Sequence, residues 1–303
     1  MACDRVCRAR SVVGVTDYAY AFVDVFAARP FSGNPVTVVP DADDLDLATM
    51  QAIAREFNQS ETTFLLRPDI EGADHQLRSF TPVGAEVGGA GHNALGAWIW
   101  LARAGRLPGG RSQFAQQIGR NLLPVTVNSD SDGVEVSMVQ SPPVTGDTVA
   151  DRDELAASLT LRPADLAPSP ALVISTGAGH LLVEVNDRAA VDRSTPDSPR
   201  LKAALQAVGG EGCYVYTREG STDAYARFFN PTVGIMEDPA TGTAAGPLAT
   251  RLVSDGILPD GATAVIEQGA ALGRPSLIRV TVRGTHVRIS GRGLISADGT
   301  LYV

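Results

Sequence analysis

A short polar segment in the first quarter of the chain holds residue types that acid–base chemistry requires. The sequence Asn-Gln-Ser-Glu-Thr-Thr-Phe at residues 58–64 places Ser60 and Glu61 between the predicted end of a helix and an apolar strand. A carboxyl group among apolar neighbours has a raised pKa and can move a proton near neutral pH. The alternative is a solvated carboxylate where the strand begins. Glu61 is therefore the first candidate for an acid–base residue.

Two further segments place polar residues at the start of apolar helices. Gly91-His92 opens one helix, and the segment 237–243, Glu-Asp-Pro-Ala-Thr-Gly-Thr, opens the other. A His at a helix N-terminus tends to stay neutral because the helix dipole opposes its charge, and it can then donate a hydrogen bond to a substrate oxygen. Asp238 is interpreted either as the cap of the second helix or as a site residue that faces His92. His180, just after a Gly turn, is placed at the rim of such a site.

The two helix starts belong to an internal repeat. Residues 78–96 and 227–246 both read Arg-x-Phe-x-Pro, followed by a Gly-containing turn, an acidic residue and a Gly that opens a helix. The matching glycines, Gly91 and Gly242, lie half a chain apart, which predicts a duplicated fold with two facing halves rather than a solenoid. Each helix N-terminus offers free N–H groups to an anion. The first hypothesis is a carboxylate substrate held between two lobes.

The elements around these segments predict an α+β fold. Each half has many short strands and one helix that is apolar nearly all round, at 91–104 and 242–254, and such a helix is a buried one. Two curled sheets, each wrapping its helix, follow from this pattern. Further helices are predicted from Asp46 to Phe57 and near 199–208, and the Pro-rich stretch 141–151 is the expected linker.

Composition excludes several functional classes. The chain has 303 residues, 44% of them hydrophobic, and a formal net charge of −9. An acidic protein without a long apolar run is not expected to bind nucleic acid or a membrane. Residues 1–17 are interpreted as a disordered leader that includes Cys3 and Cys7, while Cys213 is predicted in a buried strand. With no disulfide framework, the expected location is the cytoplasm.

The sequence has longer motifs at residues 33–39, 58–64, 78–92, 227–249, 273–277 and 290–295. Together they resemble the PhzF family of phenazine biosynthesis proteins, which shares the diaminopimelate epimerase fold. The resemblance implies two pseudo-symmetric lobes, each a curled, mainly antiparallel β-sheet or barrel around a central helix, with the site in the cleft. It also implies no cofactor, no metal and a homodimer. We expect residues 18–140 with 275–303 to form the N-terminal lobe and 141–274 the C-terminal lobe.

The resemblance also implies roles for individual residues. Glu61 matches the acid/base glutamate of the family, and His92 and Asp238 match its substrate-contacting residues. Racemases of this fold use two cysteines, but Ala90 and Ala240 stand at those positions, and alanine carries no proton. The two-cysteine racemase interpretation is therefore disfavoured. The residues that match the groups lining the substrate's carboxylate, amine or hydroxyl are Ser60, Gly91, Gly242 and Thr243.

The expected function is an isomerase that acts on trans-2,3-dihydro-3-hydroxyanthranilate or a close cyclic amino acid. Glu61 would move a proton from the hydroxyl-bearing carbon to another ring carbon. One alternative is a family member that acts on a different small carboxylated metabolite, since fold does not determine substrate. A second alternative is a non-catalytic protein that binds a small molecule. Thr243, where Ser is usual, and Asn93 leave the substrate preference open.

Overall fold

The computed structural model describes residues 16–303. Most of the predicted leader, 1–17, lies outside the described residues, as do Cys3 and Cys7. The last two residues of that range form part of the fold. Thr16 exchanges backbone hydrogen bonds with Val303, and Asp17 pairs with Tyr302. The first described residues therefore pair with the end of the chain.

The first lobe is a sheet that closes on itself around one helix. Strand β2 pairs in parallel with β3, β3 pairs with β4, β4 pairs in parallel with β6, and β6, β7 and β8 form a meander. Its elements are β1 (Asp17–Val25), β2 (Asn34–Val39), α1 (Leu47–Phe57), β3 (Glu61–Leu66), β4 (His75–Phe80), β5 (Glu86–Val87), α2 (His92–Arg103), β6 (Gln113–Ile118), β7 (Asn121–Asp130) and β8 (Gly133–Val139).

The second lobe repeats the same pairings. Strand β11 pairs in parallel with β12, β12 pairs with β13, β13 pairs in parallel with β15, and β15, β16 and β17 form the meander. The predicted pseudo-symmetry and α+β class are confirmed by this correspondence. Its elements are β9 (Val144–Thr148), α3 (Arg152–Ser158), η1 (Pro163–Asp165), β10 (Leu172–Ser175), β11 (Gly179–Glu184), α4 (Arg188–Arg193), α5 (Ser198–Ala207), β12 (Gly212–Thr217), β13 (Ala224–Asn230), β14 (Ile235–Asp238), α6 (Gly242–Ser254), β15 (Thr263–Gln268), η2 (Ala270–Leu272), β16 (Ser276–Arg283) and β17 (His286–Tyr302).

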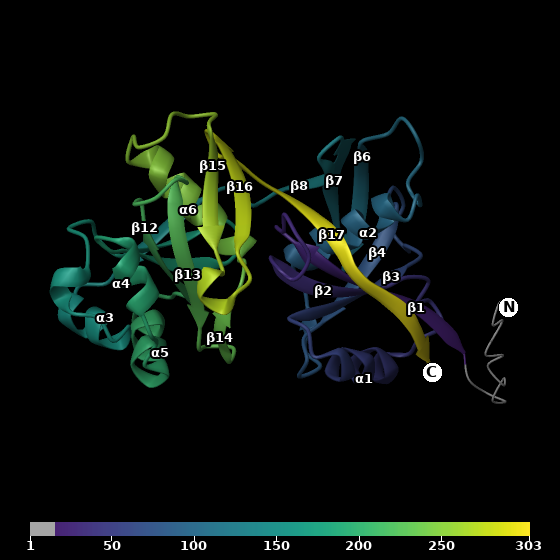
Figure 1. Ribbon diagram of the computed structural model, residues 1–303, viewed down its shortest axis with the longest axis horizontal. Helices are drawn as coiled ribbons and strands as arrows, with labels where there is room; N and C mark the ends of the chain where they lie inside the picture. Colours follow the sequence, from purple (N-terminus) through teal and green to yellow (C-terminus); the bar gives the residue numbers. More distant parts are fainter. Residues whose placement is uncertain (1–15) are drawn as a thin grey trace, which may run out of the picture.

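The long strand β17 joins the two lobes. Figure 1 shows this strand, in yellow, running from the second lobe on the left to the first lobe on the right. Its first part pairs with β16 and β8, and its last part pairs with β1. Strand β16 pairs with β15 of the second lobe, although it falls in the range 275–303 that we assigned to the first. The return of the chain to the first lobe therefore takes place within β17.

The two central helices pack too closely against their sheets for larger residues. A Cβ atom at Gly96 of α2 would lie 2.2 Å from Val36 Cγ1, and one at Gly242 of α6 would lie 2.3 Å from Ile289 Cδ1. Most other residues of both helices are buried, as the apolar pattern predicted. The sheets consequently hold the N-terminus of each helix in a closely defined position.

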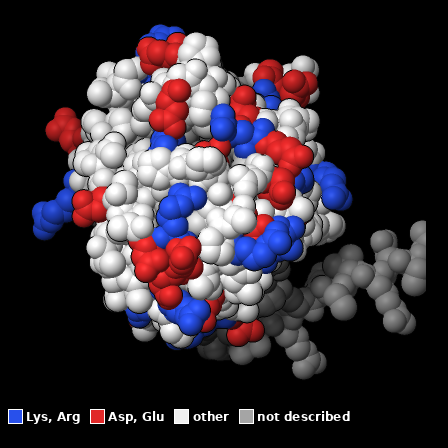
Figure 2. Space-filling model, turned by 90° about the vertical axis from the view of Figure 1, so that its left-hand side faces the viewer, with Lys and Arg blue, Asp and Glu red and all other residues white. Residues whose placement is uncertain are grey.

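The region between the lobes and the surface of the second lobe differ from the expectation. The predicted linker 141–151 contains β9, which pairs with β10, and two short helices, α3 and α4, were not predicted. Figure 2 shows acidic and basic side chains interspersed on the outer face of the second lobe. Cys213 is buried in β12, as predicted. Within residues 16–303, no helix is long and apolar enough to cross a membrane.

Candidate active site

Glu61 lies at the start of β3, beside Val36 of β2. Helix α1 ends at Phe57, and the left-handed conformation of its C-cap residue, Asn58, turns the chain toward the strand. Among the described residues, the Glu61 Oε2 atom is buried without a hydrogen-bond partner. Burial, and then the nearby Asp238 carboxylate, raise the pKa of Glu61 from 4.5 to about 8. The solvated-carboxylate interpretation is therefore wrong for this side chain.

Asp238 ends β14 and lies near Glu61 across the two lobes. Its Oδ1 accepts a hydrogen bond of 2.9 Å from Asn34 Nδ2, and its Oδ2 accepts one from the Thr241 hydroxyl. Burial raises the pKa of Asp238 to about 6, and the Thr241 and Asn34 hydrogen bonds oppose that rise. The helix-cap interpretation of Asp238 is wrong, because Thr241 is the N-cap of α6.

Asn34 connects the acid–base candidates, and the sequence analysis did not single it out. Besides its bond to Asp238, its Nδ2 donates to the Ala240 carbonyl at 2.8 Å, while its Oδ1 accepts from Ser60 Oγ at 3.1 Å. It is fully buried at the start of β2. The available signal was its position in the Gly-Asn-Pro turn, where a polar residue precedes an apolar strand.

Gln268 at the end of β15 fixes the backbone on the other side of Asp238. Its Nε2 donates to the Asp238 carbonyl at 2.7 Å and to Thr241 Oγ1 at 3.1 Å, and its Oε1 accepts from the Thr241 N–H at 3.1 Å. The Tyr214 hydroxyl donates to the same Oε1 at 2.8 Å. Because every one of these groups is paired, the turn that carries Asp238 has a defined geometry.

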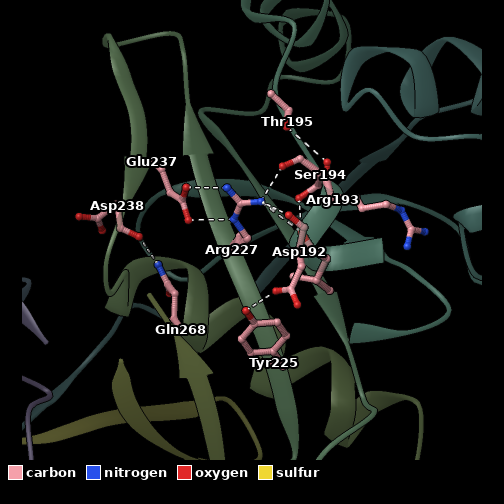
Figure 3. Close-up of polar contacts among 10 residues, drawn as sticks. Asp192, Arg193, Ser194, Thr195, Tyr225, Arg227, Glu237, Asp238 and Gln268 are labelled. Atoms are coloured by element: carbon pink, nitrogen blue, oxygen red, sulfur yellow. Dashed lines mark hydrogen bonds and ion pairs between the residues drawn. The ribbon is translucent and has the colours of Figure 1, made fainter. Parts of the chain in front are cut away.

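Glu237 does not join Asp238 in the site. Figure 3 shows Glu237 pointing toward Arg227, whereas the Asp238 carboxylate points away from it. The guanidinium donates two hydrogen bonds to Glu237, at 2.9 and 2.7 Å, and others to carbonyls at the end of α4. In the first lobe, Arg78 binds Glu86 in the same two-pronged way. Glu86 and Glu237, the equivalent acidic residues of the repeat, therefore each form an ion pair with the arginine of their own hairpin. Asp238 has no acidic equivalent in the first lobe, where Val87 follows Glu86.

His92 is the first residue of α2, next to the N-cap Gly91. Its Nε2 atom is buried, and no described residue pairs with it. Burial lowers the pKa of His92 to about 4, so the ring is neutral, as predicted. Within residues 16–303, no hydrogen bond joins His92 to Glu61 or Asp238.

Side chains from other elements form hydrogen bonds with the first turn of α6. Gln140 Nε2 donates to the Gly242 carbonyl at 2.9 Å, and His180 Nε2 lies 3.1 Å from Thr243 Oγ1. His180 is only 3% exposed, so its predicted position at a rim is wrong. His180 belongs to β11, which packs against α6, so its ring contacts the first turn of that helix. Ser60 and Asp238 both form hydrogen bonds with Asn34, and the charge of Asp238 contributes to the raised pKa of Glu61. Gly242 and Thr243 follow within five residues of Asp238 along the chain.

Comparison with known proteins defines the family. The model of the family described as phenazine biosynthesis-like protein, PhzC-PhzF, matches residues 23–299. The chain belongs to this family. It is 33% identical over 295 residues to the trans-2,3-dihydro-3-hydroxyanthranilate isomerase of Pseudomonas aeruginosa, covering 94% of this chain and 100% of that protein. It is 36% identical over 288 residues to an uncharacterized isomerase, YddE, of Escherichia coli O157:H7, covering 90% and 94%.

A solved structure agrees with the assignment. The crystal structure of the PhzF-family protein of Bacillus anthracis aligns with a TM-score of 0.87 and 25% identity, covering 95% of this chain and all of that one. The fold and family predicted from the motifs are confirmed. Both sequence relatives carry the name isomerase, so isomerase activity is the assignment supported at the level of the family.

Proposed function

We propose that the protein is an isomerase that shifts a hydrogen within trans-2,3-dihydro-3-hydroxyanthranilate or a close cyclic amino acid. The observation that carries the proposal is the buried Oε2 atom of Glu61 near Asp238, to which no residue of the described range 16–303 donates a hydrogen bond. A carboxylate that lacks a hydrogen-bond donor is more basic than an ordinary one. The name and 33% identity of the P. aeruginosa relative support the choice of substrate.

Glu61 serves as base and then as acid. Its ionised form takes the proton from the hydroxyl-bearing ring carbon, and the electron pair of the broken C–H bond moves into the conjugated system of the ring. The protonated carboxyl, favoured by burial, then returns the proton to another ring carbon. The dienol that results relaxes to an aminoketone. General acid–base catalysis of this kind contributes a factor of roughly 10²–10⁴ to the rate.

The remaining candidates bind and orient the substrate. Asp238, fixed by Asn34 and Thr241, accepts hydrogen bonds from the substrate's amine or hydroxyl. Neutral His92 donates a hydrogen bond to a substrate oxygen from its Nε2, which pairs with no residue in the described part of the chain. The substrate carboxylate binds at the helix starts, where Gly91, Gly242 and Thr243 present N–H groups at the positive ends of the helix dipoles. Ser60 supports this arrangement through its hydrogen bond to Asn34.

Incubation of the purified protein with trans-2,3-dihydro-3-hydroxyanthranilate in heavy water tests the proposal. The expected result is loss of the substrate absorbance and, by mass spectrometry, coupled products that have gained deuterium where Glu61 exchanged its proton with solvent. Glu61→Gln, with unchanged circular dichroism, should reduce turnover by a factor of roughly 10²–10⁴. A Glu61→Gln variant with the turnover of the wild type would refute the role of Glu61.

A different carboxylated metabolite is the second candidate for the substrate. It is favoured by the 36% identity to a relative whose name specifies only an isomerase. Absence of turnover with the anthranilate substrate, combined with solvent exchange into another cyclic amino acid, would support it. Tight binding of the first substrate without any product would instead support a non-catalytic binding protein.

The family resemblance also leads us to propose a homodimer that works without a cofactor. Size-exclusion chromatography with light scattering tests the first part, and a mass of one chain, 31.6 kDa, would contradict it. The absence of a cofactor is tested with protein that has been dialysed against a chelator and whose absorbance spectrum shows only its aromatic residues. Such protein should still turn over the substrate.

A further inference from the structure

Thr243 is the one side chain at the start of α6 that reaches the outside of the packed core. All residues from Pro239 to Leu252 are buried except Thr243, which is partly exposed. The N-cap Thr241 contributes no side-chain hydrogen bond to the N–H groups of the first turn, as far as the described residues show. The Thr243 hydroxyl therefore stands beside free N–H donors of a 13-residue helix.

The Thr243 hydroxyl forms a hydrogen bond with the buried ring of His180. Its Nε2 lies 3.1 Å from Thr243 Oγ1, and its ring stacks edge-on against Phe228, with 5.0 Å between the ring centroids. On the far side, Gly212 approaches so closely that a Cβ atom there would lie 3.2 Å from Nδ1. The imidazole is consequently fixed in place between β12, β13 and α6.

The surroundings of the ring determine which nitrogen carries the proton. Nδ1 is buried, and no described residue forms a hydrogen bond with it. Burial lowers the pKa of His180 to about 4, so the ring is neutral and carries one N–H. A buried N–H without an acceptor is rare in proteins, because it loses its bond to water without replacement. The proton therefore lies on Nε2, which donates to Thr243 Oγ1.

A threonine hydroxyl that accepts this bond keeps its own hydrogen for another acceptor. We propose that His180 is a positioning residue that directs the Thr243 hydroxyl as a hydrogen-bond donor toward the carboxylate of the substrate. The inference rests on the proposed function, which places the carboxylate at the N-terminus of α6. Through this contact, the hydroxyl acts together with the N–H groups of the same helix turn on one anion.

Binding of a ligand that cannot react separates this role from turnover. The probe is 3-hydroxyanthranilate, an aromatic analogue with no hydrogen to shift at its hydroxyl-bearing carbon, measured by calorimetry. His180→Leu should weaken its binding about 10- to 100-fold, the loss expected for one hydrogen bond to a charged group. His180→Gln, whose amide can donate from nearly the same position as Nε2, should retain most of the affinity. With the proposed substrate, His180→Leu should raise KM with little change in kcat.

The ligand 2-aminophenol provides the matched control, because it lacks only the carboxylate. Its affinity should be the same for the wild type and for His180→Leu. Thr243→Val should reproduce the loss seen with His180→Leu, Thr243→Ser should not, and the double variant should lose no more than either single one. The Thr243→Val and Thr243→Ser variants test the contact between His180 and Thr243 even if His180→Leu does not fold.

Three results would overturn the inference. They are wild-type affinity in His180→Leu, an equal loss of affinity for 2-aminophenol, and failure of His180→Gln to restore binding. If the wild type binds no 3-hydroxyanthranilate, the proposed substrate fails and this role fails with it. If the wild type binds the probe but the variants do not follow the pattern above, only the role of His180 fails.

Discussion

Replacement of Glu61 by Gln should stabilise the fold while it removes activity. The native pKa of Glu61 is raised from 4.5 to about 8 by burial, so between these pH values the native state binds a proton that the unfolded state does not. Stability of the wild type therefore falls as pH rises through this window and is unaffected below it. Gln resembles the neutral carboxyl and carries no such penalty.

The magnitude follows from the size of the shift. At 1.36 kcal/mol per pKa unit, the penalty removed by Glu61→Gln is about 3 kcal/mol at pH 7, about 5 kcal/mol at pH 9 and under about 1 kcal/mol at pH 5. Turnover should fall by a factor of roughly 10²–10⁴, because an amide cannot carry the proton. The carboxyl group that we propose as the acid–base residue thus lowers the stability of the protein.

Urea unfolding at pH 5, 7 and 9 measures this effect. Glu56→Gln is the matched control, since Glu56 is an exposed residue of α1 only five positions away and undergoes the same chemical change. The difference in free energy of unfolding between Glu61→Gln and the wild type should grow with pH, and that of the control should not. A difference that is constant from pH 5 to pH 9, or a loss of stability, would refute the reasoning.

Three further predictions concern the same site. First, kcat/KM should rise with pH and level off above about 8, because only ionised Glu61 accepts a proton; a flat profile from pH 6 to pH 9 would count against this. Second, Asn34→Leu should raise the pKa of Asp238 and reduce kcat/KM about 10-fold or more, because a hydrogen bond to a charged group contributes about 1.5–3 kcal/mol; steady-state kinetics with unchanged circular dichroism decides it. Third, Gly242→Ala should destabilise the fold by about 1–3 kcal/mol, because its Cβ would lie 2.3 Å from Ile289 Cδ1. Adding Ile289→Val removes that atom and should restore much of the loss in thermal unfolding, whereas an unchanged midpoint for Gly242→Ala alone would contradict the packing argument.

Local patterns in the sequence determined the architecture. The boundaries of α6 at 242–254 and the helix capped by Asp46 follow from apolar periodicity and cap chemistry, which act within a few residues. The repeat around Gly91 and Gly242 predicted two equivalent lobes, because equal local signals produce equal local structures. The motif around Glu61 likewise placed an acid at the start of a strand.

Only the tertiary structure decided which polar groups meet. Asn34 and Asp238 lie two thirds of the chain apart, and nothing local to either residue indicates their hydrogen bond. The same holds for His180, which looked exposed after a Gly turn but is buried against Thr243. Whether a carboxyl or an imidazole has a partner depends on the elements packed around it, and so does its pKa. The sequence alone therefore indicated the residue types of the site, while the packing of the two lobes determined their protonation and their partners.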